Sequence, residues 1–242
     1  MSAPLWQPGR AEQNSQLSHF WQQAREISGE PLPDYRALHG WSVQHPETFW
    51  RQVWDHCGII GEPGSTVLEP AARFQDCRWF PQATLNYAEN LLQRNDAHPA
   101  LVSELEDGTR QVISYAQLRV AAGQVAAQLQ AAGVQPGDRV AGFMPNRIET
   151  VVAALGAAWI GAVWSSCSPD FGVSGVLDRF GRIEPRVLIA CDGYHYNGKW
   201  IDLEPRIHEL HSALSPELLV VVPGKGSSSR VQKALIWQAW LD

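Results

Sequence analysis

Short apolar runs alternate with longer helical segments from residue 99 onward, and this alternation constrains the fold more than any other feature. Buried strands are predicted over residues 140–144, 163–166, 187–190 and 218–222. The segments between them have helical periodicity over residues 148–160, about 173–183 and about 203–214. Successive strand–helix–strand units require parallel pairing, with the helices packed on the sheet faces. We therefore expect an α/β fold.

Turn and capping residues mark the boundaries of several elements. Residues 100–114 contain two short strands around an acidic turn that ends in glycine, which predicts a β-hairpin. Ser114 and Gln117 have the spacing of a capping box, and the helix that they open is expected to end at Gly133. Asn146 is expected to cap the helix that follows the first parallel strand.

The N-terminal part of the chain has helical patterns without strand alternation. One amphipathic helix is predicted between Ser15 as its cap and Gly29 as its end, and a second opens at Pro46. Six of the eleven tryptophans fall in the first 79 residues, which also separates this part from the rest. We expect a mainly helical region over residues 1–97 and an α/β region over residues 98–242.

Charge and hydrophobicity exclude several classes of protein. The chain has 25 acidic and 19 basic residues, a formal net charge of −6, and 45% hydrophobic residues. This content is too apolar for a disordered chain. Because lysine and arginine form no block, neither a nucleic acid nor an anionic membrane is expected as the main partner.

The cysteines and the apolar runs indicate a cytoplasmic protein. The four cysteines are far apart and include no CxxC pair, so neither a zinc site nor a disulfide scaffold is predicted. The first residues lack the pattern of a signal peptide. The longest uncharged apolar run covers residues 151–164, which is short of the roughly 20 residues that cross a bilayer.

Several short motifs only approach functional patterns. His208 and His211 are one residue too close for a metalloprotease zinc motif, and residues 172–175 lack the spacing of a nucleophile elbow. Lys225 lacks the first glycine that a Walker A loop requires, and residues 224–229 are better described as a flexible loop. No GxGxxG fingerprint is present. These motifs provide no catalytic residue and no metal ligand.

Two segments that follow neighbouring strands are the better candidates for a site. Residues 165–172 contain small hydroxyl residues, a proline and a helix start, and residues 192–199 contain two tyrosines, a histidine and a lysine. In open α/β sheets, the turns at the carboxyl ends of the strands form the ligand crevice. Aromatic and cationic groups together suit a nucleotide base and phosphate. An ordinary turn and a solvated surface loop are the alternatives.

Characteristic segments along the chain indicate a family. They are WFPQATLNYAENLL at residues 79–92, GVQPGDRV at 133–140 and GAVWSSCSPDFG at 161–172, followed by DGY at 192–194 and GK at 198–199. Taken together, they resemble the adenylate-forming acyl-CoA synthetases, and most closely the members that act on acetoacetate. The resemblance covers nearly the whole chain.

This resemblance implies a fold and a reaction. The fold is a helical N-terminal extension packed on the first α/β subdomain of an adenylate-forming ligase, truncated. In such ligases acetoacetate attacks the α-phosphate of ATP with the help of Mg²⁺, and the thiol of CoA then displaces AMP. The family's phosphate loop, its adenine- and ribose-binding motifs and its adenylation lysine have no counterpart in this sequence. The chain alone is therefore expected to lack adenylation activity and to contact only CoA.

The resemblance also implies a CoA site, and the segments that match it supply six candidates: Ser168, Pro169, Asp170, His195, Tyr196 and Lys199. Lys199 occupies a position that is basic in the relatives, whereas Tyr196 stands where they have an arginine. Two other functions stay open, a ligase for a different short acid such as acetate or propionate, and a non-catalytic CoA-binding or interaction module. Self-association through the exposed truncated face is a further expectation.

Overall fold

The computed structural model describes residues 5–7, 9–226 and 228–242. The expectation about the chain start therefore falls partly on residues outside the described ranges, and so does part of the loop predicted at 224–229. The chain divides into two compact units, residues 1–85 and residues 86–242. The boundary expected near residue 97 stays a prediction.

The first unit is mostly helical. Its elements are α1 (Arg10–Gln13), α2 (Gln16–Ser28), α3 (Tyr35–Gln44), α4 (Pro46–His56), the strands β1 (Leu68–Glu69) and β2 (Arg78–Trp79), and the 3₁₀ helix η1 (Phe74–Asp76). Ser15 caps α2 by accepting a hydrogen bond from the backbone N–H of Ser18 at 3.3 Å. Gly29 ends α2 in the left-handed conformation, with φ of 69°. Both boundaries confirm the sequence-based prediction.

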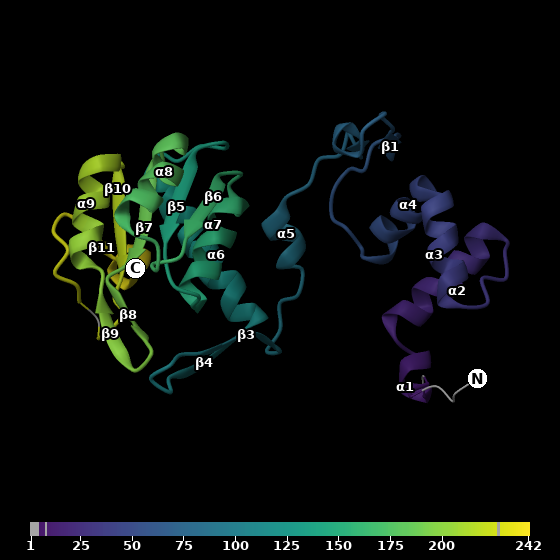
Figure 1. Ribbon diagram of the computed structural model, residues 1–242, viewed down its shortest axis with the longest axis horizontal. Helices are drawn as coiled ribbons and strands as arrows, with labels where there is room; N and C mark the ends of the chain where they lie inside the picture. The colour runs from purple at the N-terminus through teal and green to yellow at the C-terminus, as the bar shows by residue number, and fades with distance from the viewer. Residues whose placement is uncertain (1–4, 8, 227) are drawn as a thin grey trace. The chain divides into compact units, whose positions relative to one another are not determined.

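The second unit is an α/β domain (Figure 1). Its helices are α5 (Tyr87–Leu91), α6 (Tyr115–Ala131), α7 (Ile148–Trp159), α8 (Val173–Ile183), α9 (Glu204–Leu214) and α10 (Trp237–Leu241). Its main sheet has the order β11–β10–β7–β5–β6, and every neighbouring pair is parallel. These strands are β5 (Arg139–Phe143), β6 (Val163–Cys167), β7 (Val187–Cys191), β10 (Leu218–Val222) and β11 (Leu235–Ile236). The α/β expectation is confirmed.

Two hydrophobic clusters cover the two faces of this sheet. In β7, Val187, Ile189 and Cys191 belong to one cluster, whereas Leu188 and Ala190 belong to the other. Successive side chains of a strand point to opposite faces, so a strand that is buried on both sides is apolar throughout. Helices α6, α7 and α10 contribute to the first cluster, and α8 and α9 contribute to the second.

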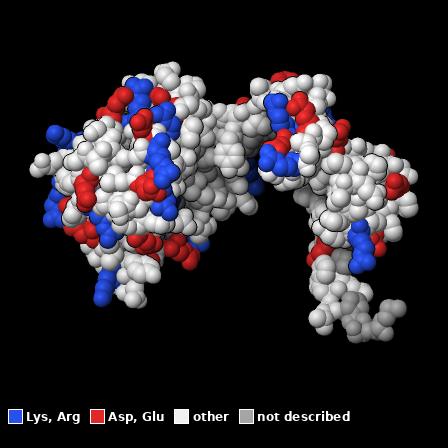
Figure 2. All heavy atoms as spheres, turned by 45° about the horizontal axis from the view of Figure 1, so that its top comes forward, with Lys and Arg blue, Asp and Glu red and all other residues white. Residues whose placement is uncertain are grey.

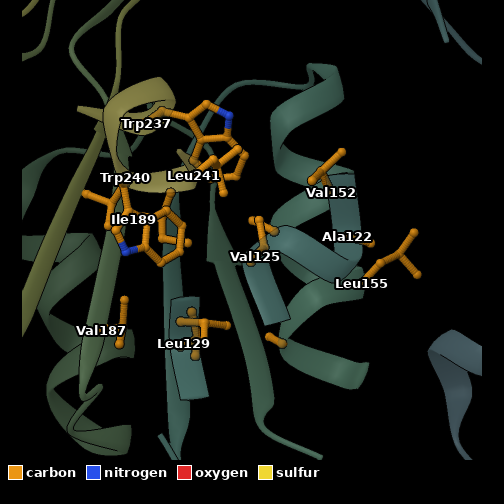
Figure 3. Close-up of a cluster of buried hydrophobic side chains, with 14 of the residues drawn as sticks. Ala122, Val125, Leu129, Val152, Leu155, Val187, Ile189, Trp237, Trp240 and Leu241 are labelled. Atoms are coloured by element: carbon orange, nitrogen blue, oxygen red, sulfur yellow. The ribbon is translucent and has the colours of Figure 1, made fainter. Parts of the chain in front are cut away.

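The short C-terminal helix α10 belongs to this core. Figure 3 shows Trp237, Trp240 and Leu241 close to Ile189 of the sheet, with Val125 of α6 beside them. The three α10 side chains are 8%, 6% and 9% exposed. Burial of two indole rings explains how a helix of five residues is held in place.

Helices α6 and α7 approach each other closely at a glycine. A Cβ atom added to Gly156 would lie 2.5 Å from the Cγ1 of Val125 and 3.0 Å from the carbonyl oxygen of Ala122. Both distances are shorter than ordinary van der Waals contact. The absence of a side chain at Gly156 therefore sets the spacing between the two helices.

The predicted helix starts are partly correct. The capping box at α6 is present, because the Ser114 hydroxyl accepts from the Gln117 backbone at 3.2 Å and the Gln117 side chain accepts from the Ser114 backbone at 2.8 Å. The cap predicted at Asn146 is wrong, since Arg147 occupies the N-cap position of α7 and makes no side-chain cap. The Arg147 guanidinium instead binds Glu149 through contacts of 2.6 and 2.8 Å.

The surface of the α/β unit has a mixed charge. Figure 2 shows lysine and arginine side chains interspersed with acidic ones on the visible face of this unit. Among the described residues, no helix is long and apolar enough to cross a membrane.

Candidate functional site

The carboxyl ends of three neighbouring strands are joined by two polar side chains. Asp192, directly after β7, accepts a hydrogen bond from the backbone N–H of Gly224, beyond the end of β10, at 2.7 Å. Arg147, beyond the end of β5, reaches the Sγ of Cys191 at 3.6 Å and the carbonyl oxygen of Pro223 at 3.3 Å. These hydrogen bonds hold the turns that follow the three strands in fixed relative positions. In α/β proteins, ligands bind at this edge of the sheet.

The turn after β6 is organised around a carboxylate. The Ser168 hydroxyl donates to Oδ2 of Asp170 at 2.9 Å, and the Tyr194 hydroxyl donates to Oδ1 at 2.6 Å. Arg206 of α9 donates to the carbonyl oxygen of Pro169 at 2.8 Å. The structure thus brings the three candidates of this turn together and adds two residues that are not among the six candidates: Tyr194, from the second candidate segment, and Arg206.

These contacts shift the acidity of both partners. The hydrogen bonds from Tyr194 and Ser168 hold the pKa of the Asp170 carboxyl below its usual value. Partial burial, together with the hydrogen bond to Asp170, raises the pKa of Tyr194 to about 12. At neutral pH the phenol is therefore a proton donor and the carboxylate is charged, which is the pairing that a short hydrogen bond requires.

The second candidate segment is a β-hairpin, whereas the sequence predicted a loop. Strands β8 (Gly193–Tyr196) and β9 (Lys199–Asp202) pair antiparallel. The two linking residues, Asn197 and Gly198, have φ of 49° and 72°. Positive φ at both central residues defines the type I′ turn, for which Asn-Gly is the preferred sequence. This dipeptide was the local signal that identifies the hairpin.

The alternation of the strand sends His195 to the face opposite Tyr194. His195 pairs with Trp200 across the hairpin, with ring centroids 5.2 Å apart, and its Nδ1 lies 3.5 Å from the Oδ2 of Asp107. Asp107 and Glu106 form the turn of the hairpin β3 (Pro99–Glu104) and β4 (Arg110–Ser114), and the Glu106 carboxylate accepts from the Gly198 N–H at 3.4 Å. The turns of the two hairpins are therefore in contact.

A hollow of about 190 Å³ lies on this side of the hairpin. Its lining includes Glu104, Asp107, Arg147, His195 and Trp200. The pKa of the Asp107 carboxyl is lowered, first by the backbone N–H of Thr109 and to a smaller extent by the charge of His195. The Nδ1 of His195 is thus engaged by an acidic neighbour, and the role of this residue in CoA binding stays a prediction.

Tyr196 and Lys199 are the exposed candidates of the hairpin, while Ser168 and Asp170 are exposed in the turn after β6. Tyr196 and Lys199 face each other next to the turn of the hairpin, and Tyr196 is 59% exposed. Lys199 forms no ion pair with any residue that the structure describes. An unpaired ammonium next to an exposed aromatic ring is suited to bind an anionic ligand that carries a planar base.

The residues of the other short motifs, His208 and Lys225, make contacts within the protein that need no ligand. The Nδ1 of His208 is 2.9 Å from the carbonyl oxygen of Glu204, within its own helix. Lys225 lies over the ring of Trp200, 4.2 Å from the centroid. In residues 5–7, 9–226 and 228–242, no group of three or more His, Cys, Asp or Glu side chains is arranged to hold a metal ion.

Comparisons with known proteins identify the family. Residues 88–235 match the model of the AMP-binding enzymes, and residues 35–91 match the acetyl-coenzyme A synthetase N-terminus. An acetoacetyl-coenzyme A synthetase of Rhizobium meliloti is 43% identical over 93% of this chain and 35% of its own length. A malonamoyl-CoA synthetase of Penicillium aethiopicum is 37% identical over 90% of this chain and 31% of its own length.

A solved structure agrees with these matches. The acetoacetyl-CoA synthetase from Streptomyces lividans is 38% identical and superposes with a TM-score of 0.89, covering 99% of this chain and 38% of that one. The chain spans about a third of the length of the curated relatives that it matches. With the parallel sheet and the family model in agreement over more than half of its residues, the chain belongs to the AMP-binding enzyme family.

Proposed function

We propose that this chain contributes the CoA-binding part of an acetoacetate-CoA ligase. The observation that carries the proposal is the 43% identity to an acetoacetyl-coenzyme A synthetase over 93% of the chain. The reaction of such a ligase converts acetoacetate, ATP and CoA into acetoacetyl-CoA, AMP and pyrophosphate. A cytoplasmic location and self-association belong to the same proposal, and sedimentation velocity measures the latter.

Within this reaction, the residues of the chain bind and orient CoA. The Lys199 ammonium supplies a positive charge for a CoA phosphate, and the exposed ring of Tyr196 supplies a surface for the adenine. The turn at residues 168–170 forms the neighbouring wall, at the carboxyl edge of the sheet. Orientation of the CoA thiol toward an acyl group is the contribution expected of such a surface, because a fixed geometry replaces a random encounter.

ATP and Mg²⁺ serve the first half of the family's reaction, in which the metal neutralises charge on the phosphates. The described residues do not fit this role, since they include no cluster of metal-binding side chains. The sequence also has no phosphate loop that combines glycine and hydroxyl residues with a terminal lysine. We therefore assign no adenylation step to this chain, and we expect no acetoacetate-dependent exchange of pyrophosphate into ATP.

For the acid that is activated, the comparisons offer a specific alternative to acetoacetate. A relative that matches 90% of the chain at 37% identity is a malonamoyl-CoA synthetase. Similarity of this degree is thus compatible with a different short acid. Ligation of another small acid, with CoA bound by the same residues, is the second candidate function.

Thermal unfolding in the presence of CoA tests the proposal. A ligand that binds only the folded state raises its stability, so millimolar CoA should raise the Tm. We expect Lys199→Gln to weaken the CoA Kd by about tenfold, because one charge-assisted contact is lost. Lys233→Gln removes the same charge away from the hairpin and should leave the Kd unchanged. An unchanged Tm at millimolar CoA would contradict the proposed site.

A further inference from the structure

Both carboxylate oxygens of Asp170 already accept a hydrogen bond from a hydroxyl group of the chain. Its Oδ1 accepts from Tyr194 at 2.6 Å, and its Oδ2 accepts from Ser168 at 2.9 Å. CoA carries several negative charges and the Asp170 carboxylate stays charged at neutral pH, so direct contact between the two is unfavourable. The two hydroxyl donors instead turn this carboxylate into a junction between two segments that are 24 residues apart in the sequence.

The hairpin needs such a junction. Strands β8 and β9 have four residues each, and among the described residues they pair only with each other. An isolated two-stranded hairpin is marginally stable in water, so contacts to the rest of the domain must fix its direction. On one face Tyr194 donates to Asp170 and packs with Ile201 against the second hydrophobic cluster. On the other face His195 contacts Asp107, and the Gly198 N–H donates to Glu106.

The turn that holds Asp170 is itself tethered. Arg206 binds the carbonyl oxygen of Pro169 at 2.8 Å, and Arg179 lies 4.3 Å from the ring centroid of Phe171. Asp170 is therefore a fixed support. Tyr196 follows Tyr194 by two residues and projects from the same face of the strand. A fixed Tyr194 consequently fixes the position of the exposed Tyr196.

We propose that Tyr194 is a positioning residue and Asp170 its anchor, which together hold the β8–β9 hairpin in the orientation that presents Tyr196 and Lys199 to CoA. Asp170 makes no direct contact with CoA in this arrangement. The inference rests on the proposed CoA-binding function for its ligand, whereas the attachment of the hairpin is a property of the chain alone. The two parts are measured separately.

Two measurements on the full chain test the pair. Hydrogen exchange of the amides at residues 193–202 reports the attachment of the hairpin, and calorimetric titration reports the CoA Kd. We expect Tyr194→Phe and Asp170→Ala each to accelerate that exchange about tenfold and to weaken CoA about fivefold. The double variant should match the single variants, because either change already breaks the same bond.

Conservative variants separate positioning from general damage. Asp170→Asn keeps an oxygen that accepts from Tyr194, so it should restore most of the slow exchange and of the CoA affinity. Tyr87→Phe removes an exposed phenol elsewhere in the same unit and should change neither quantity. All variants should keep the Tm of the wild type within a few degrees.

Several results would overturn the inference. Additive effects in the double variant, or unchanged exchange in Tyr194→Phe, would show that the hydroxyl does not hold the hairpin. Loss of CoA binding in Asp170→Ala with unchanged exchange would make Asp170 a direct ligand. A wild-type chain that binds no CoA would refute the proposed function, while the exchange data would still decide whether Tyr194 anchors the hairpin.

Discussion

Replacement of Gly156 by alanine tests how closely α6 and α7 are packed. The new methyl group would lie 2.5 Å from the Val125 Cγ1 and 3.0 Å from the Ala122 carbonyl oxygen. Neither partner moves freely, because Val125 is fully buried and the carbonyl belongs to the α6 backbone. Relief of the clash therefore requires the two helices to separate.

The size of the effect follows from two opposing contributions. Overpacking of a closely packed core costs about 1–3 kcal/mol, and contact with a branched side chain and a backbone atom places this site near the upper limit. Alanine is favoured over glycine in a helix by about 1 kcal/mol. We therefore expect Gly156→Ala to lower the free energy of unfolding by about 2 kcal/mol.

Urea unfolding followed by circular dichroism measures this change, and hydrogen exchange in α6 and α7 assigns it to the α/β unit. Gly181→Ala is the matched control, since Gly181 lies in α8 and a Cβ there would meet no atom within 4 Å. It should stabilise the chain by about 0.5–1 kcal/mol.

A second core change makes the packing explanation refutable. Val125→Ala alone should cost about 2–3 kcal/mol, through lost methyl groups and the cavity that they leave. In the double variant the new methyl of residue 156 occupies part of that cavity. The combined loss should thus be smaller than the sum of the two separate losses by about 2 kcal/mol. A neutral Gly156→Ala, or simple additivity, would refute the reasoning.

Three further predictions concern charged side chains and cysteine thiols. Arg147→Met leaves the Glu149 carboxylate, 20% exposed, without its partner, and should lower the free energy of urea unfolding by about 2 kcal/mol. The double variant Arg147→Met/Glu149→Leu should regain most of this loss. A single variant as stable as the wild type would contradict the stabilising role of the pair. Hydrogen bonds from the Gln135 backbone N–H and then from Arg186 hold the pKa of the Asp138 carboxyl below its usual value of 3.8. The stability that this carboxylate contributes is therefore complete above that pH and is lost as the pH falls through the folded pKa. Asp138→Asn should flatten the acid loss of stability followed by circular dichroism, and an unaltered loss would exclude Asp138 as its source. Cys57 is exposed, whereas Cys191 is buried, and burial raises the pKa of its thiol. Ellman's reagent and peptide mass spectrometry should therefore find Cys57 labelled in the native chain and Cys191 labelled only after unfolding. Labelling of Cys191 in the native chain would show that the carboxyl edge of the sheet opens.

The elements that the sequence predicts correctly are those that neighbouring residues decide. The cap at Ser15, the left-handed end at Gly29 and the reciprocal box of Ser114 and Gln117 each depend on atoms within a few residues. The parallel sheet follows from the alternation of apolar runs and amphipathic helices, because few arrangements bury both. Local chemistry and the global fold agree at these positions.

Contacts between distant residues account for the errors. Asn146 is a good capping residue by type, but the Arg147 side chain is directed by Glu149 nearby and by Cys191 and Pro223, which follow it by 44 and 76 residues. No local pattern reports such partners. The helix start consequently shifted by one residue from the expected cap.

The candidate site also combines features that the sequence predicts with contacts that it does not. The polar character of residues 168–170 and 192–199 is evident from the sequence, and the Asn-Gly turn identifies the hairpin. The hydrogen bond between Tyr194 and Asp170, and the contact between His195 and Asp107, join segments whose proximity only the folded sheet provides. For this reason the sequence indicates which segments matter and leaves the roles of Tyr194 and Asp170 to the structure.

The β8–β9 hairpin leaves and rejoins the domain at almost the same point. Gly193 pairs with Asp202, and the N–H of Leu203 binds the carbonyl oxygen of Asp192 at 2.8 Å, so the backbone on either side is closed before the hairpin begins. Such an appendage can change in length or sequence at a small cost in loop-closure entropy, without a change in the register of the parallel strands. The surface that we propose to face CoA can therefore diversify, by evolution or by grafting, independently of the core that supports it.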